Sequence, residues 1–178
     1  MRKNTKKLLI STGLVWVVSV ISSCDEKPKS NTASPADPFS SAVSLPTERL
    51  TIGGEVFTVE LAFQQHTRLR GLMFRESLPA NAGMLFLFER EKPRSFYMKN
   101  CLIDLDILFI KADGEIARIS TMKVPEPGKP LIYYSCETPV KYVLELPAGT
   151  AGRLGIKAGQ KIVLTSRITN ALPDPENS

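Results

Sequence analysis

Two aspartates in an apolar stretch are the residues best placed to do chemistry. Asp104 and Asp106 lie within SFYMKNCLIDLDILFI, residues 95–110, which is otherwise nearly continuous apolar sequence and predicts a strand. Residues two apart on a strand point to the same face. Two carboxylates on one face could form a general acid–base pair or bind a metal ion, or they could be held by hydrogen bonds from their neighbours. The sequence leaves these three alternatives open.

Four more polar side chains near this strand are candidates for a binding site. Lys99 and Asn100 precede it, and Arg70 and Arg75 flank a Gly-Leu-Met-Phe segment. Arginine can hold an anion through two parallel hydrogen bonds, whereas a buried carboxylate needs a partner that one of these cations could supply. We take Arg70, Arg75, Lys99, Asn100 and Asp106 as the candidate binding residues, and we favour a structural network as the role of Asp106.

Sulfur-containing residues raise two further alternatives. Cys101 and Cys136 could form a disulfide in an oxidising compartment or remain as free thiols, and only geometry decides between these. A catalytic cysteine would need a nearby base, and His66 is the one histidine of the chain. Thioethers bind Cu(I), but the methionines after Met1 are not clustered in sequence, which favours core packing. These methionines are Met73, Met84, Met98 and Met122.

Motifs typical of enzymes are not found in the sequence. It has no Ser-His-Asp order, no zinc-ligand spacing and no phosphate-binding glycine loop. A single histidine argues against the commonest acid–base catalysis, although carboxylate chemistry stays open. We therefore favour a protein that is not an enzyme and expect neither a cofactor nor a bound metal.

The N-terminal segment predicts export and lipidation. Four basic residues in the first seven precede an apolar run from Leu8 to Ile21, which is shorter than the roughly 20 residues that a spanning helix needs. The run ends in Ile21-Ser22-Ser23-Cys24, which resembles the cleavage box of bacterial lipoproteins. We predict a signal peptide over residues 1–23 and acylation of Cys24, with a plain secretory signal or an uncleaved anchor as the alternatives. Several acyl chains suffice for stable membrane anchoring.

From this leader we expect the protein to lie in the cell envelope, anchored to a membrane and facing outside the cytoplasm. Of the 23 basic residues, 19 follow residue 23, against 18 acidic residues, so the net charge beyond the leader is +1. This excludes the basic surface expected of a nucleic-acid-binding protein. Residues 24–46 are rich in Ser, Pro and charge and predict a disordered tether with a reach of about 25 Å. We expect membrane lipid as one partner, and an envelope protein, glycan or small ligand as another.

Residues 47–168 have the pattern of a single β-rich domain, followed by a frayed tail over 169–178. Gly53-Gly54 and Asp113-Gly114 predict hairpin turns. Short helices are predicted over 65–73 and within 147–156, and a long proline-rich loop over 123–139. Further strands are predicted at 83–89, 94–100, 105–110, 140–146 and 159–168. We expect a mainly β (α+β) fold, a small partly closed β-barrel of about eight short strands with two short helices.

Several short motifs together resemble a known family. They are Arg70-Gly71-Leu72-Met73-Phe74-Arg75, Leu78-Pro79, Gly83-Met84-Leu85-Phe86, Phe96-Tyr97-Met98-Lys99-Asn100, Leu105-Asp106-Ile107 and Leu144-Glu145-Leu146-Pro147-Ala148-Gly149. Their order and spacing are similar to those of the uncharacterised prokaryotic domain of unknown function one-nine-two (DUF192) family. The resemblance implies a mostly β single domain and no particular activity. Asp104 departs from the family pattern, which weakens the reading of Asp104 and Asp106 as a catalytic pair.

Two functions remain. The first is a lipid-anchored, non-enzymatic binding or accessory module of the cell envelope. The second is an envelope enzyme that uses Asp106 with Lys99 or Arg75, and copper handling by methionines is a weaker third. A catalytic Asp106 requires open space beside it, whereas a structural Asp106 requires that its oxygens be occupied.

Overall fold

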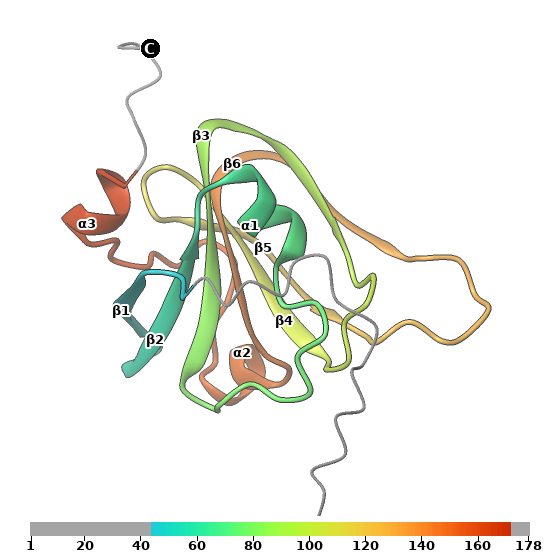
Figure 1. The fold of residues 1–178 in the computed structure, drawn as a ribbon. Helices are drawn as coiled ribbons and strands as arrows, with labels where there is room; N and C mark the ends of the chain where they lie inside the picture. The colour runs from blue at the N-terminus through green and yellow to red at the C-terminus, as the bar shows by residue number, and fades with distance from the viewer. Residues whose placement is uncertain (1–43, 172–178) are drawn as a thin grey trace, which may run out of the picture. The chain divides into compact units, whose positions relative to one another are not determined.

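Six β-strands form one sheet in the order β1-β2-β3-β6-β4-β5 (Figure 1). The computed structural model describes residues 44–171, and every structural statement below concerns these residues. The strands are β1 (Thr47–Ile52), β2 (Glu55–Ala62), β3 (Ala82–Tyr97), β4 (Leu105–Ile110), β5 (Ile116–Met122) and β6 (Tyr133–Pro147). The helices are α1 (Gln65–Arg70), α2 (Thr150–Arg153) and α3 (Ser166–Thr169). Neighbouring strands are antiparallel except β2 and β3, which are parallel.

Several predictions fall on residues outside this range. The predicted signal peptide, Cys24 and most of the tether precede residue 44, and most of the predicted tail follows residue 171. Within the described range, no helix is long and apolar enough to cross a membrane.

Both predicted hairpin turns are confirmed. Gly53 and Gly54, with φ of 57° and 85°, join β1 to β2, and Gly114, with φ of 85°, lies in the turn from β4 to β5. Positive φ is readily adopted only by glycine. A Cβ on Gly114 would also lie 2.3 Å from the Ile162 carbonyl oxygen, so this turn needs glycine for space as well.

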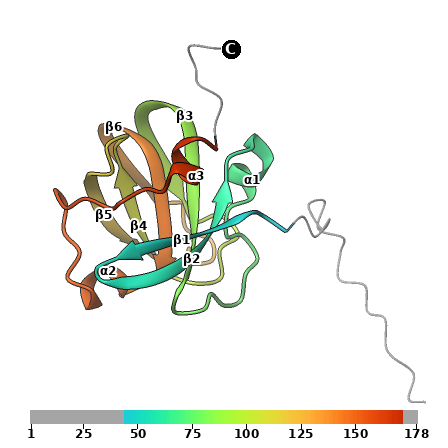
Figure 2. The same ribbon diagram turned by 90° about the vertical axis from the view of Figure 1, so that its left-hand side faces the viewer.

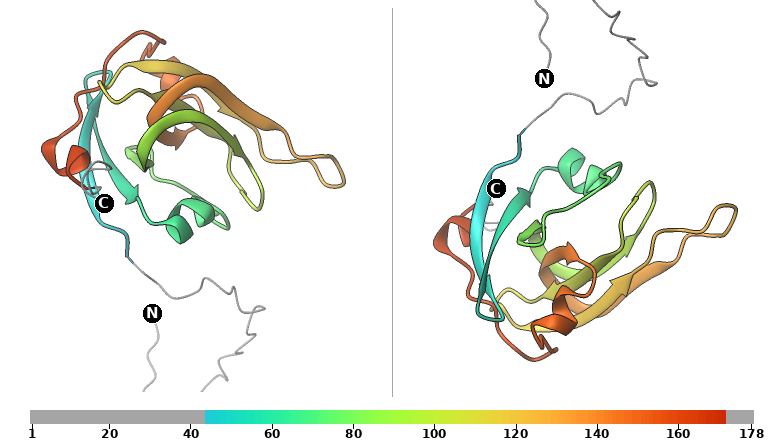
Figure 3. Two further views of the ribbon diagram at one scale, coloured as in Figure 1. Left: turned by 90° about the horizontal axis from the view of Figure 1, so that it is seen from above. Right: turned by 90° about the horizontal axis from the view of Figure 1, so that it is seen from below.

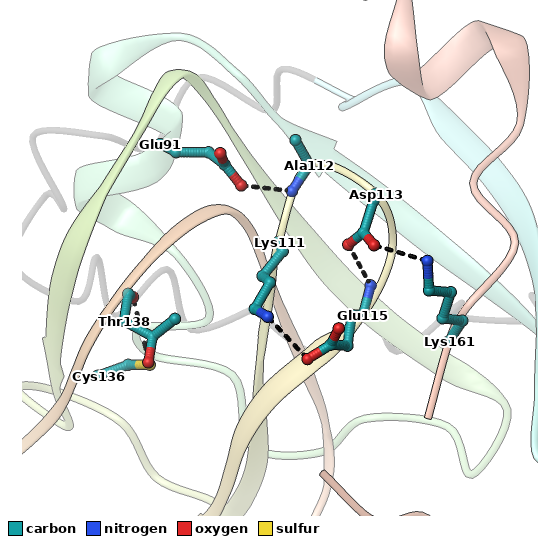
Figure 4. Close-up of polar contacts among 8 residues, drawn as sticks. All are labelled: Glu91, Lys111, Ala112, Asp113, Glu115, Cys136, Thr138 and Lys161. Atoms are coloured by element: carbon teal, nitrogen blue, oxygen red, sulfur yellow. Dashed lines mark hydrogen bonds and ion pairs between the residues drawn. The ribbon is translucent and has the colours of Figure 1, made fainter. Parts of the chain in front are cut away.

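Polar contacts tie the β4–β5 turn to its surroundings (Figure 4). The Asp113 carboxylate accepts a hydrogen bond from the Glu115 N–H at 3.1 Å and pairs with Lys161 Nζ at 2.6 Å. The Glu91 carboxylate accepts from the Ala112 N–H at 2.7 Å. The turn therefore contacts both the middle of β3 and the C-terminal segment.

The mainly β character and the short helices are confirmed, but the predicted partly closed barrel is not supported. The sheet curves strongly (Figure 3), yet β1 and β5 remain its two edges. The strands predicted at 83–89 and 94–100 form one long strand, β3, because the chain bends through register shifts rather than through a turn. The loop predicted over 123–139 is also shorter, since β6 already begins at Tyr133.

The C-terminal segment 159–168 does not form the predicted strand. It makes a single isolated bridge between Glu115 and Lys161 and then continues into α3. Ile162 and Ile168 instead place their side chains in the same hydrophobic cluster as Leu50 of β1. Figure 2 shows α3 close to β1 and β2. The segment therefore fills the open side of the sheet with side chains and does not close it with strand pairing.

The centre of the sheet is buried on both faces. Leu85 and Leu144 belong to a hydrophobic cluster on one face, and Met84 and Val143 to a second cluster on the other. The crossover between the parallel strands β2 and β3 carries α1, which lies on the concave side of the sheet (Figure 3). Any polar side chain on the central strands must therefore find a partner or line a cavity.

Asp106 is such a residue, and its oxygens are occupied. Its Oδ1 accepts a hydrogen bond from the Thr121 hydroxyl at 2.7 Å, and its Oδ2 accepts from the Ala151 N–H of α2 at 2.8 Å. Asp104 precedes β4 and has a different partner, Lys123 Nζ at 2.7 Å, whose hydrogen bond lowers the pKa of Asp104. The two aspartates therefore do not share a site, and Asp106 holds α2 and β5 to β4.

We expect Asp106→Ala to lower the free energy of unfolding by about 2–4 kcal/mol. Hydrogen bonds to a carboxylate contribute about 1.5–3 kcal/mol each, and the substitution leaves the donors of Thr121 and Ala151 unpaired. Asp106→Asn should cost less, because its amide oxygen can still accept from Ala151. Urea denaturation at neutral pH measures both. Glu126→Ala, which breaks an exposed pair with Lys129, is the control and should change stability by less than about 1 kcal/mol. An Asp106→Ala variant as stable as the wild type would refute this role.

Candidate functional site

A pocket of about 340 Å³ lies between α1 and the strands β3 and β6. This volume is at the lower end of the range typical of small-molecule sites, about 300–1,000 Å³. Its wall consists of residues from α1 and the turn after it, from β3, from the loop before β4, and one residue of β6. They are Gln65, Arg68, Leu69, Arg70, Gly71, Leu72, Met73, Phe86, Phe88, Pro93, Arg94, Ser95, Phe96, Tyr97, Cys101 and Glu145.

Glu145 is the buried acid of this pocket. It lies on β6 opposite Met84 of β3 and Ile107 of β4, and its side chain is only 5% exposed. Among residues 44–171 no hydrogen bond or ion pair reaches its carboxyl group. Burial without a partner raises its pKa from 4.5 to about 8, since the charged form is poorly solvated there. At neutral pH Glu145 is therefore a neutral carboxylic acid that can donate one hydrogen bond.

Cys101 lies beside this acid and is not an activated thiol. It is buried, and desolvation, with a smaller contribution from the charge of Glu145, raises its pKa to about 11. A thiol is nucleophilic as the thiolate, so this environment suppresses its reactivity. Cys101 and Cys136 are both free and buried, so the disulfide considered from the sequence is not formed. The Cys136 thiol instead donates to the Thr138 carbonyl at 3.5 Å (Figure 4).

Two arginines of the wall stack on one aromatic ring. The guanidinium carbons of Arg68 and Arg94 lie 5.2 Å and 3.8 Å from the centre of the Phe88 ring. Arg68 donates to the carbonyls of Phe63 and Leu87, the latter at 3.1 Å. Both side chains are half-buried, and within the described range neither pairs with a carboxylate. Two like charges are thus held near each other without a counter-charge.

Arg94 is the more constrained of the two. One terminal nitrogen donates to the Arg90 carbonyl at 2.9 Å, while its Nε is buried and has no hydrogen-bond partner in the described part of the chain. Burial, and then the positive charge of Arg68, lower the pKa of Arg94. Its guanidinium group is therefore incompletely solvated and would gain from an anion.

Packed phenyl rings form the apolar wall. The Phe96 ring contacts three other rings edge to face. Its centre lies 5.2 Å from that of Phe86, 6.5 Å from that of Phe88 and 6.1 Å from that of Phe109. Edge-to-face packing is a favoured arrangement of aromatic rings. These contacts fix the shape of the wall independently of any ligand.

Two strained residues hold the turn next to the pocket. Phe74 and Asn100 have φ of 63° and 57°, which is uncommon for residues other than glycine. The Phe74 N–H donates to the Asn100 carbonyl at 2.8 Å, and the adjacent Met73 and Cys101 line the pocket. Backbone strain of this kind persists where the surrounding structure enforces it, and functional sites are a common setting.

The family of the chain follows from comparison with family models. Residues 48–164 match the DUF192 model, described as "Uncharacterized ACR". The chain belongs to the DUF192 family. The match covers the sheet from Glu48 onward and all residues that line the pocket of this DUF192 domain, and it confirms the resemblance seen in the sequence. The comparison with curated proteins gives no significant match.

Two solved structures are similar to the DUF192 domain. One is a protein from Sinorhizobium meliloti 1021 whose name provisionally calls it a transcription regulator. It is 40% identical, with 68% of this chain and 95% of that chain covered and a TM-score of 0.59. The other is a protein of unknown function from Novosphingobium aromaticivorans DSM 12444. It is 33% identical, with 75% of this chain and 94% of that chain covered and a TM-score of 0.59. Both solved chains consist almost entirely of the matched domain, so in these two structures the domain folds without much further chain.

The candidate binding residues from the sequence do not form one site. Arg70 lines the pocket, and Asn100 lies in the strained turn beside it. Arg75 instead makes a two-pronged pair with Glu60, at 2.7 Å and 2.6 Å, which raises the pKa of Arg75. Lys99 is exposed and does not line the pocket.

Asp106 lies on the opposite face of the sheet from the pocket. In the β4–β6 register Asp106 lies opposite Leu146, whose side chain belongs to the hydrophobic cluster on the face away from the pocket. Glu145 lies opposite Ile107, which belongs to the cluster on the pocket side. Among residues 44–171 no group of three or more His, Cys, Asp and Glu side chains is arranged to hold a metal ion.

Sequence reasoning did not select Glu145, Arg68 or Arg94. Glu145 had a detectable signal, because a charged residue inside the apolar run Tyr-Val-Leu-Glu-Leu must be either paired or neutral when the strand is central. Arg68 and Arg94 had no such signal in the sequence. They come close to each other only because β3 bends and α1 packs against the sheet.

The buried acid makes stability depend on pH. Unfolding returns the pKa of Glu145 from about 8 to 4.5, so as pH rises the unfolded chain releases this proton before the folded chain does. Relative to Glu145→Gln, the wild type should lose up to about 1.4 kcal/mol of unfolding free energy per pH unit between about pH 5 and 8, and no more above that.

Urea denaturation of both proteins across this pH range measures the effect. Glu126→Gln, which changes an exposed carboxylate, is the matched control and should follow the wild type at every pH. Parallel curves for the wild type and Glu145→Gln would show that Glu145 is ionised in the folded protein and would refute the assignment.

Proposed function

We propose that this DUF192 protein is a lipid-anchored, non-enzymatic binding module of the cell envelope whose pocket takes a small ligand. The observation that carries the proposal is Glu145, an almost fully buried acid that lines the pocket and has no hydrogen-bond or ion-pair partner among residues 44–171. Glu145 does not stabilise the folded protein, because an apolar side chain would fill the same position without a desolvation cost. A bound polar group would supply the hydrogen bond that Glu145 lacks.

The chemistry of the pocket favours binding over catalysis. Cys101 is held as an inert thiol by its raised pKa, and among the described residues that line the pocket no second carboxyl or imidazole group could exchange a proton with Glu145. The enzyme considered from the sequence would use Asp106 with Lys99 or Arg75. Asp106 is 1% exposed with both oxygens occupied, and Arg75 is paired with Glu60, so this alternative has no support.

Copper handling is not favoured by the packing of the methionines. Met84, Met98 and Met122 are at most 2% exposed and belong to the hydrophobic cluster that also contains both cysteines. Met fills irregular core gaps well, which accounts for these positions without a metal.

The name of the Sinorhizobium protein suggests regulation of transcription. The charge of this chain gives no support for DNA binding. Beyond residue 23 there are 19 basic and 18 acidic residues. A DNA-binding domain needs a concentrated basic surface to neutralise phosphates. Membrane anchoring through Cys24 remains part of our proposal and rests on the sequence of the leader.

Small fragments should bind at the pocket and nowhere else with comparable affinity. We expect a fragment library, followed by amide NMR on residues 39–178, to shift signals clustered around Gly71, Ser95 and Glu145. Phe88→Ala removes part of the apolar wall and should weaken these fragments about tenfold, which corresponds to about 1.4 kcal/mol. Val163→Ala, which removes an exposed apolar side chain outside the pocket, is the control. Hits that cluster elsewhere, or that ignore Phe88→Ala, would count against the binding function.

Lipidation can be tested on the full chain in a bacterial host. We expect the mature N-terminal peptide to begin at Cys24 and to carry the mass of a thioether-linked diacylglycerol. Cys24→Ser should accumulate with residues 1–23 still attached, whereas Cys101→Ser should be processed like the wild type. Mass spectrometry of the N-terminal peptide decides between the outcomes, and an unmodified N-terminus at another position would rule out the anchor.

A further inference from the structure

Arg68 and Arg94 place two positive charges against the Phe88 ring, and among residues 44–171 neither makes an ion pair. Both guanidinium groups are fixed by backbone carbonyls and by the Phe88 ring, so they are held in place without a ligand. Each guanidinium carries five N–H donors, and the hydrogen bonds found in the described range use few of them. Holding two like charges together is unfavourable unless an anion is shared between them. Preorganised arginine pairs are suited to carboxylate and phosphate oxygens.

A second hollow strengthens the positive field at this point. Arg68, Phe88 and Arg94 also line an adjoining space of about 180 Å³, where Arg90 and Lys92 join them. One acid, Glu89, lines the same space. The local balance is four cations to one acid, which attracts an anion to this end of the pocket.

One wall of the pocket is apolar, although Gln65, Arg70, Ser95 and Tyr97 also line it. Phe86, Phe88 and Phe96 form this wall through edge-to-face contacts, and Glu145 lines the same pocket. Glu145 is opposite Met84, and Met84 and Phe88 are four residues apart on β3. At about 3.3 Å per residue, four residues of regular strand span some 13 Å, so Phe88 and the position opposite Glu145 lie at different points along β3. A neutral Glu145 does not repel an anion and can donate a hydrogen bond to its far end.

We propose that the pocket binds a small organic anion with an apolar body, which places its acidic group on Arg68 and Arg94 and its body against Phe88 and Phe96. A carboxylate and a phosphate ester share this chemistry. The ligand fills one pocket of about 340 Å³, and its inner end lies at Glu145. This assignment rests on the proposed binding function and adds the class of ligand.

Calorimetric titration of residues 39–178 tests the class with three matched probes. They are 4-phenylbutyrate, 4-phenylbutyl phosphate and the neutral 4-phenylbutyramide. We expect at least one of the two anions to bind tenfold or more tightly than the amide and to weaken as sodium chloride is raised. The ranking of carboxylate against phosphate identifies which acidic group the arginines prefer.

Substitution of the arginines should remove this advantage. Arg94→Gln is expected to bring the anion to within about twofold of the amide, and Arg94→Lys, which keeps the charge but not the planar fork, to an intermediate value. Arg49→Gln on the edge strand β1 removes one exposed charge outside the pocket and should leave the ratio unchanged. Thermal melting confirms that each variant is folded, and Arg68→Gln replaces Arg94→Gln if the latter does not fold.

The outcomes separate this inference from the binding function. If the amide binds as tightly as both anions, or if fragments occupy the pocket while neither anion binds, the pocket binds a ligand but the anionic class is wrong. If neither the probes nor the fragments bind, both proposals fail. Equal loss of anion affinity in Arg94→Gln and Arg49→Gln would show that only net charge matters, which would also overturn the assignment.

Discussion

The structure depends on one strand that is buried on both faces. β6 lies at the centre of the sheet with β3 on one side and β4 on the other, and residues 142–146 are all buried. Alternation along the strand sends Leu144 and Leu146 to one hydrophobic cluster and Val143 to the other. Because Glu145 lies between the two leucines, this pairing carries its carboxyl group into the core. No solvent-facing position is available to it unless the whole register shifts, which would expose the apolar residues.

The bend in β3 turns this burial into a pocket. Register shifts after Leu87 carry the strand away from regular pairing until Arg94 meets Cys136 on β6. Phe96 thereby returns to the same side of the sheet as Phe86 and contacts it edge to face. The parallel β2–β3 connection places α1 across the concave side, and Arg68 reaches the Leu87 carbonyl where the bend begins. Two constraints of the backbone, a bulge and a crossover, therefore assemble side chains that are distant in sequence.

Local features of the fold were predictable from the sequence, and features that depend on tertiary pairing were not. The turns at Gly53-Gly54 and Asp113-Gly114 follow from short-range steric preferences and are confirmed. The helix predicted over 65–73 is present but shorter, as Gln65–Arg70. Residues 159–168 have the composition of a strand, yet they make one isolated bridge, and Ile162 and Ile168 place their side chains in the hydrophobic cluster that also contains Leu50 of β1. The site was predicted poorly for a similar reason. Arg75 and Arg94 are equally basic in sequence, and only the fold pairs the first with Glu60 and leaves the second without a carboxylate partner in the described part of the chain.

The contrast between the two buried acids indicates which of them serves function. Asp106 and Glu145 lie on opposite faces of the same sheet, and both are almost completely buried. Asp106 accepts two hydrogen bonds that join β4, β5 and α2, and these bonds offset the desolvation cost of its burial. Glu145 joins nothing among the described residues, and its raised pKa measures a cost that the folded chain does not recover. A residue that costs stability and lines a preformed pocket is better explained by what the pocket binds than by the fold that contains it.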